Sequence, residues 1–196
     1  MKRMTRTAIP VTIAVLVVLM GSCSGDLSKS SSPVTLNVTN TQAITHFDLQ
    51  PGAANCNQNI GTVTVQALLL SSQVNPNLPV DSRFNTVNLT GYTVQYVRRD
   101  GGTLVPAPFS RAASGAIQPG SSTALSNFLV IEPSALNQAP FAALTPSGGG
   151  RDPETGKAVV TMDVILTVFG ETLAGERVSG TTHMTLDFCY ACQGCA

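Results

Sequence analysis

The sequence predicts an all-β fold, a sandwich of about seven strands in two packed sheets. Three observations lead to this prediction. Charged residues make up only 11% of the chain, while small and β-branched residues are abundant, and such side chains suit a half-buried pleated sheet. Short β-rich runs alternate with clusters of Gly, Pro, Asn and Ser. No long helical pattern interrupts these runs, so they are expected to pair with one another as strands.

Each expected strand is a short run rich in β-branched or aromatic residues. In one of them Tyr92, Val94 and Tyr96 occupy every second position, so their side chains share one face. A short helix is expected over residues 133–139, between the fifth and sixth strands, and Pro140 limits it. The seven expected strands cover residues 34–38, 60–70, 92–98, 103–105, 127–131, 159–169 and 177–188.

Two stretches, residues 91–97 and 168–178, resemble strands of the immunoglobulin-like or fibronectin-type modules found on bacterial surface proteins. The resemblance covers roughly residues 34–188 and implies an immunoglobulin-like sandwich with strands A to G in chain order. The tryptophan of antibody-type domains is absent from the chain, and so is their buried intersheet cysteine pair. Fold resemblance of this kind does not assign a function.

The first 23 residues carry a targeting signal. A basic start at residues 1–6 precedes an apolar run at residues 8–20, which is the layout of a cleaved secretory signal peptide. Residues 20–23, Met-Gly-Ser-Cys, resemble a bacterial lipobox, which implies that Cys23 is lipid-modified and becomes the first mature residue. Ser24 in place of Asp then implies sorting to the outer membrane, by resemblance to lipoproteins of diderm bacteria. An ordinary signal peptide and an uncleaved anchor helix are the alternatives.

The lipobox-like pattern divides the chain into three expected segments. They are a signal peptide (1–22), a lipidated cysteine with a polar tether (23–33) and the sandwich domain with a cysteine-rich C-terminus (34–196). The ten tether residues after Cys23 have a typical reach of about 18 Å. Signal cleavage removes three of the 11 basic residues and leaves 8 against 11 acidic ones. This mild negative balance argues against nucleic acid as a partner.

The four remaining cysteines are Cys56, Cys189, Cys192 and Cys195, and in an oxidising compartment they are expected to form disulfides. If neighbouring strands alternate in direction, Cys56 and Cys189 lie at the same end of the sandwich and are in a position to pair. Four cysteines allow three pairings, and the sequence leaves the choice open. A zinc site and a redox-active Cys-x-x-Cys are the alternatives.

No catalytic motif is recognisable, so neither an enzyme nor a cofactor or metal site is expected. Both histidines, His46 and His183, are expected to be structural. A glycine-rich loop at residues 147–152 is expected to be a mobile tip. The charged residues beside the turns are expected to be solvated, namely Arg98, Arg99, Asp152 and Glu154.

The alternating topology places residues 71–89, 110–125 and 170–175 at one end of the sandwich, and this end is the expected contact surface. The candidate binding residues there are Asn75, Asn77, Leu78, Phe84, Glu171 and Leu173. We expect a non-enzymatic, membrane-anchored module of the cell envelope that contacts another envelope protein or supports a surface assembly. The first alternative is a small-ligand or metal-binding lipoprotein that uses the cysteine-rich end. The second is an envelope enzyme whose catalytic groups come from distant loops.

Overall fold

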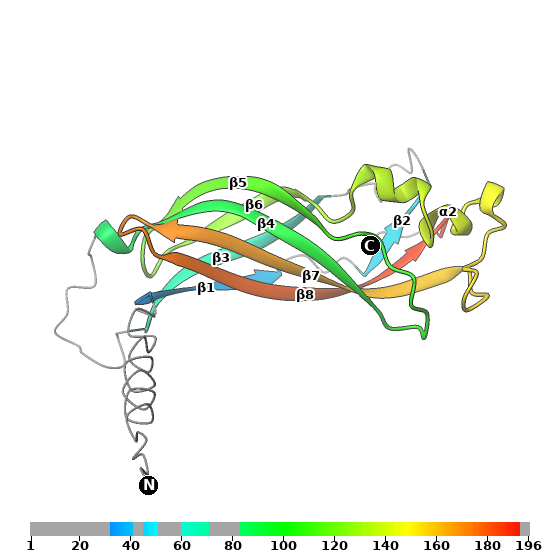
Figure 1. Cartoon of the computed structure of the whole chain (residues 1–196), viewed down its shortest axis with the longest axis horizontal. Coiled ribbons are helices and arrows are strands. Elements are labelled where there is room, and N and C mark those ends of the chain that lie inside the picture. The colour runs from blue at the N-terminus through cyan, green and yellow to red at the C-terminus, as the bar shows by residue number, and fades with distance from the viewer. Residues whose placement is uncertain (1–31, 41–44, 51–59, 71–82, 193–196) are drawn as a thin grey trace, which may run out of the picture. The chain divides into compact units, whose positions relative to one another are not determined.

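The computed structural model describes residues 32–40, 45–50, 60–70 and 83–192 (Figure 1). Two sheets pack face to face in this part of the chain. One has three strands in the order β1-β3-β6, and the other has five in the order β2-β8-β7-β4-β5. The strands are β1 (Val34–Asn40), β2 (His46–Asp48), β3 (Ile60–Leu69), β4 (Val87–Arg98), β5 (Phe109–Ile117), β6 (Ser122–Leu129), β7 (Val159–Thr172) and β8 (Arg177–Cys189). The all-β prediction is confirmed.

The main errors in strand placement concern the middle of the chain. Residues 103–105 do not form a strand, because the backbone N–H groups of Thr103 and Leu104 donate to the carboxylate of Glu154 and not to a neighbouring strand. The strand beside β4 is β5, which the sequence analysis missed. It is an edge strand of mostly small, exposed residues, so it lacks the alternation that would indicate a strand. The short β2 was missed as well.

The core lies between the two sheets, and the alternation predicted in β4 is confirmed because Tyr92, Val94 and Tyr96 are all buried. Two tyrosine hydroxyls bridge the sheets. The hydroxyl of Tyr92 accepts from the backbone N–H of Leu129 at 3.0 Å, and the hydroxyl of Tyr96 donates to the carbonyl of Val130 at 2.7 Å. Burial raises the pKa of Tyr96, so its hydroxyl remains a donor. These bonds fix β4 against the end of β6.

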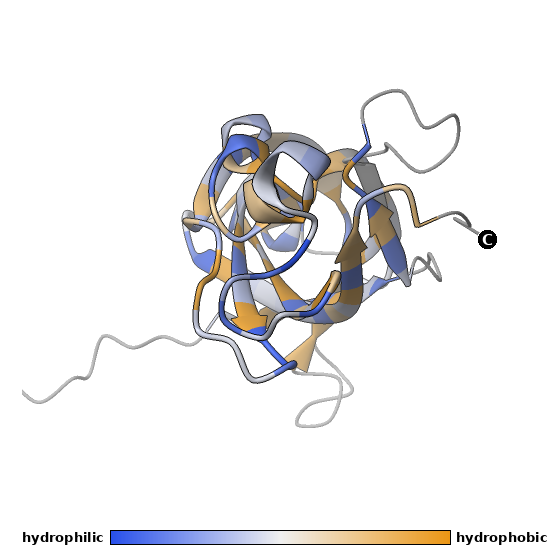
Figure 2. Cartoon of the chain, turned by 90° about the vertical axis from the view of Figure 1, so that its right-hand side faces the viewer, coloured by the Kyte–Doolittle hydropathy of each residue, from blue (hydrophilic) through white to orange (hydrophobic). Residues whose placement is uncertain are grey.

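One edge of the sandwich is closed by a close approach of β1 to β8. At Gly180 an added Cβ would collide with the carbonyl oxygen of Leu36 and the side chain of Val38, so the absence of a side chain permits the contact. Seen from the end in Figure 2, the strands curve around one common interior.

The predicted helix at residues 133–139 is a 3-10 helix, Pro133–Asn137, and a short α2, Phe141–Leu144, follows it. Phe141 and Leu144 are buried in the core, and the ring of Phe141 packs on that of Phe188 near the end of β8, with the ring centroids 5.0 Å apart. A further 3-10 turn, Pro146–Gly148, occupies part of the loop expected to be a mobile tip. Backbone hydrogen bonds from Gly150 and Arg151 to residues 143–145 hold that loop in place. Among the described residues, no helix has the length and apolar character needed to cross a bilayer.

Candidate functional site

Three connections meet at one end of the sandwich, named here the loop end and defined by residues 83–86, 118–121 and 173–176. Val87 at the start of β4 pairs with Thr172 at the end of β7 and with Ile117 at the end of β5. Ser122 at the start of β6 pairs with Gln66 near the end of β3. The turns at residues 83–86, 118–121 and 173–176 therefore lie at one end (Figure 1, left), whereas most of the predicted region 110–125 belongs to β5 and β6.

Backbone hydrogen bonds join two of these connections. The N–H of Leu173 donates to the carbonyl of Thr86 at 2.9 Å, and the N–H of Ala174 donates to the carbonyl of Phe84 at 3.1 Å. A tight turn follows, in which Gly175 takes a positive φ of 86° that glycine adopts without strain. The backbone is thus held firmly, while the side chains of Phe84 and Leu173 are 68% and 54% exposed. Two large apolar side chains are therefore exposed on turns whose backbones are bonded to each other.

Of the six candidate binding residues, the structure brings Phe84 and Leu173 together. Glu171 lies within β7, where it pairs with Arg177 of β8, and is not part of the loop. The other three, Asn75, Asn77 and Leu78, lie outside the described residues.

The sequence analysis missed Leu70, which lies at the same end and is 52% exposed. Its N–H donates to the carbonyl of Pro33 at 2.7 Å, because β1 runs antiparallel to β3 and Val34 pairs with Leu69. The first strand therefore starts at the loop end. The antiparallel pairing of β1 with β3 places Leu70 at this end. The sequence indicated that pairing, because residues 34–38 and 60–70 were the first two expected strands.

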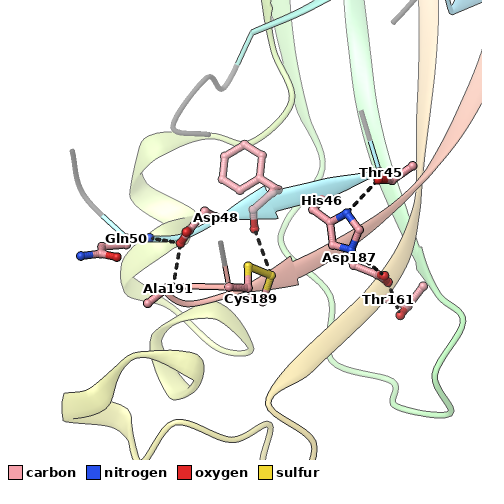
Figure 3. Close-up of a disulfide and its surroundings, with 10 residues drawn as sticks. Thr45, His46, Asp48, Gln50, Thr161, Asp187, Cys189 and Ala191 are labelled. Atoms are coloured by element: carbon pink, nitrogen blue, oxygen red, sulfur yellow. Dashed lines mark hydrogen bonds and ion pairs between the residues drawn. A yellow bond between two sulfur atoms is a disulfide. The ribbon is translucent and has the colours of Figure 1, made fainter. Parts of the chain in front are cut away.

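The opposite end, named here the cysteine end, comprises residues 45–50, 99–105, 133–157 and 189–192. Cys189 forms a disulfide with Cys192, with their Cα atoms 5.7 Å apart (Figure 3). Of the pairings that the sequence left open, the structure has Cys189 bonded to Cys192, so Cys189 does not pair with Cys56. Cys56 and Cys195 lie outside the described residues, as does the lipidation candidate Cys23.

A local turn, and not the strand topology, determines this pairing. Ala191 adopts a φ of 50° and turns the chain back, which brings Cys192 to Cys189. The buried carboxylate of Asp48 in β2 holds the turn, because it accepts from the N–H of Ala191 at 2.9 Å and from that of Gln50 at 2.8 Å (Figure 3). In this state neither bonded cysteine supplies a thiolate to a metal. Within the described ranges, no three His, Cys, Asp or Glu side chains are grouped as metal ligands.

A cluster of charges at the cysteine end corrects the expectation of solvated turns. The Arg98 cluster consists of Arg98, Asp100, Asp152 and Glu154, and the side chains of Arg98 and Asp152 are only 2% and 0% exposed. Arg98 donates from Nε and Nη2 to Asp100 at 2.7 and 2.8 Å, and from Nη2 to Asp152 at 2.9 Å. Its Nη1 donates to the carbonyl of Leu104 at 3.1 Å.

Other groups complete the bonding of the carboxylates. Asp152 accepts from the N–H and the hydroxyl of Thr155 at 2.9 and 2.8 Å, and Asp100 accepts from the N–H of Gly102 at 3.2 Å. Each carboxylate of the cluster is therefore bonded to the protein itself. This arrangement joins residues 98–104 to residues 152–155 and suits a structural connection between two loops.

The charge states agree with that role. Burial by itself raises the pKa values of Asp100 and Asp152, but the hydrogen bonds and the positive charge of Arg98 outweigh it, so both pKa values lie below their usual range. The backbone N–H of Leu104, with Thr103, lowers the pKa of Glu154. All three carboxylates are ionised at neutral pH. Arg99 is different, because its guanidinium is mostly exposed and pairs with Asp163 on β7.

Both histidines are exposed, which fits the structural role expected for them. The Nδ1 atom of His46 lies 2.7 Å from the hydroxyl of Thr45, and its Nε2 atom lies 3.8 Å from a carboxylate oxygen of Asp187 (Figure 3). His183 lies on the solvent face of β8.

Comparisons with family models, with curated proteins and with solved structures found no match to this chain. The geometry of the two ends and the sequence are therefore the basis for a proposed function.

Proposed function

We propose that this chain is a membrane-anchored, non-enzymatic lipoprotein of the cell envelope whose sandwich acts as a protein-interaction or structural module, with the loop end as its contact surface. The observation that carries the proposal is the coincidence of two features at that end. Phe84 and Leu173 expose apolar side chains on a held backbone. Pro33, the last residue of the predicted tether, lies beside Leu70 at the same end.

The strand order supports an immunoglobulin-like sandwich of about seven main strands. The three-stranded sheet joins β1, β3 and β6, which correspond to strands A, B and E of such a module. The larger sheet joins β8, β7 and β4, which correspond to G, F and C, with β5 as an additional strand beside C. In modules of this kind the loops at one end are frequent binding sites.

The lipobox-like residues 20–23 and the polar tether support the anchor. Two or more acyl chains on Cys23 would hold the protein on a membrane stably, whereas one chain binds only marginally. Ser24 supports the outer membrane as the destination.

The test combines acylation with site-specific crosslinking in intact cells. Intact-mass measurement should find a diacylglyceryl group on Cys23, and Cys23→Ala should release the protein from the membrane fraction. A photo-crosslinking amino acid at position 84 or 173 should form adducts with an envelope component. The same group at position 105, which is 39% exposed at the cysteine end, is the control. A native polypeptide found in the cytosol with an intact amino terminus would contradict the proposal.

A further inference from the structure

The most exposed large apolar side chains of the described residues lie at the loop end. Nine large hydrophobic residues of the described chain are exposed, but only three exceed half exposure: Phe84 at 68%, Leu173 at 54% and Leu70 at 52%. All three lie at the loop end, and we name them the apolar tip. Phenylalanine and leucine are the side chains that interfacial membrane-binding segments place in the headgroup and acyl boundary.

The predicted tether also enters the sandwich beside the tip. The tether ends at Pro33, whose carbonyl accepts from Leu70 of the tip. Ten tether residues have a typical reach of about 18 Å, so the connection to Cys23 favours contact between this end and the bilayer. The cysteine end lies farther from Pro33, because β7 has 14 residues and extends on the order of 45 Å at about 3.3 Å per residue.

The charges around the tip are balanced and do not oppose contact with lipid. Arg83 and Arg177 face solvent there, and Glu171 and Glu176 offset them. A strongly negative end would be repelled by an anionic lipid surface, and the described charges of this end sum to about zero.

Size distinguishes lipid from a protein partner. A stable protein interface uses roughly 20–30 residues on each side. Among the described residues, the tip has three apolar side chains, which is small for such an interface. A small apolar contact is sufficient when a tether already keeps it at high effective concentration beside its target.

We propose that the apolar tip inserts into the lipid surface that holds Cys23, so that the domain stands on the membrane with its cysteine end outward. The inference rests on the proposed lipid anchor. It makes lipid, and not a protein partner, the occupant of the loop end, so of the two proposed roles the module keeps the structural one at this surface. It makes Phe84, Leu173 and Leu70 a second membrane-binding element in addition to the acyl chains.

The chain contains no tryptophan, which provides a clean experiment. The acylated full-length protein carrying Phe84→Trp is reconstituted in phosphatidylcholine vesicles that contain lipids brominated near the headgroup. We expect a blue-shifted emission, together with quenching several-fold stronger than that of the control variant Val105→Trp. Adding Leu173→Asp to Phe84→Trp should reduce the quenching, while the protein stays bound to the vesicles through Cys23.

Each outcome bears on a different part of the proposal. An acylated, vesicle-bound protein whose indole at position 84 is unquenched overturns the inference and leaves the lipid anchor standing. A blue shift without quenching by brominated lipid also overturns it, and indicates a second copy or a protein partner. A Cys23 without acyl chains overturns both the inference and the proposed function.

Discussion

The two ends of this sandwich use their side chains in opposite ways. At the loop end, Phe84 and Leu173 are exposed on turns whose backbone is held by hydrogen bonds. At the cysteine end, Arg98 and Asp152 are buried and bonded to their neighbours, and a disulfide closes the turn after β8. Charged groups are expensive to bury, and large apolar groups are unfavourable to expose.

The difference separates structural polar groups from a contact surface. Arginine, aspartate and cysteine are the residues from which many active sites are built, yet at the cysteine end the described ones are occupied in joining loops. The apolar tip has no comparable internal role, because its side chains project into solvent.

Arg98→Met should destabilise the domain by about 3–5 kcal/mol, because it leaves two buried carboxylates without their cation. The measurement is the free energy of unfolding in urea at neutral pH. Arg111→Met is the matched control, since Arg111 pairs with Glu132 on the surface, where such pairs contribute about 0–1 kcal/mol. Equal losses in the two variants would show that the Arg98 cluster does not hold the cysteine end together.

The loss caused by Arg98→Met should shrink in acid. In the native protein the carboxyl pKa values of Asp100 and Asp152 are lowered, so their stabilisation is complete above the ordinary carboxyl pKa of about 4 and is lost as the pH falls through the lower folded pKa. In the variant the hydrogen bonds from Gly102 and Thr155 remain, but the charge and the hydrogen bonds of Arg98 no longer oppose burial. Both pKa values are therefore higher than in the native protein, and ionisation above about pH 4 stabilises the variant less. The difference in unfolding free energy should be largest near neutral pH and smallest near pH 3, the lower end of the series. A constant difference would contradict this account.

The disulfide should contribute about 2 kcal/mol in the chain-entropy model, because Cys189 and Cys192 are three residues apart. A bridge from Cys56 to Cys189 would close a loop of more than a hundred residues and contribute nearly 5 kcal/mol in the same model. Unfolding of Cys192→Ser measures the size of the effect. Peptide mapping of the native protein without reductant should recover Cys189 linked to Cys192, and recovery of Cys189 linked to Cys56 would contradict the structure.

Phe84→Ser should change the free energy of unfolding by no more than about 0.5 kcal/mol, because the side chain is exposed and its backbone contacts remain. Phe141→Ser, at the cysteine end, removes a buried ring and should cost several kcal/mol, as large core truncations do. Urea unfolding of both variants tests the contrast. A large loss for Phe84→Ser would mean that this residue stabilises the fold and is not free to form a contact.

Topology-based reasoning reached part of the candidate site. Alternating strand direction was sufficient to place the turns around residues 84 and 173 at one end, because each strand of a sandwich has to return. The same reasoning did not identify the partner of Cys189. That partner depends on the turn at Ala191, which has a positive φ and is held by the carboxylate of Asp48. The reasoning also failed for Arg98, which was interpreted as solvated because charged residues near glycine-rich turns usually are.

The sequence alone determined the all-β class, the buried face of β4 and the meeting of turns at one end. Alternation of apolar residues and reversal of strand direction are local features, and they can be followed from one strand to the next. Tertiary structure alone decided the partners of buried groups. Arg98 and Asp152 are 54 positions apart, and the turn at Ala191 is held by Asp48, 143 positions away. Such contacts depend on where two loops meet after the sheets have packed, and no periodicity in the chain encodes that meeting point.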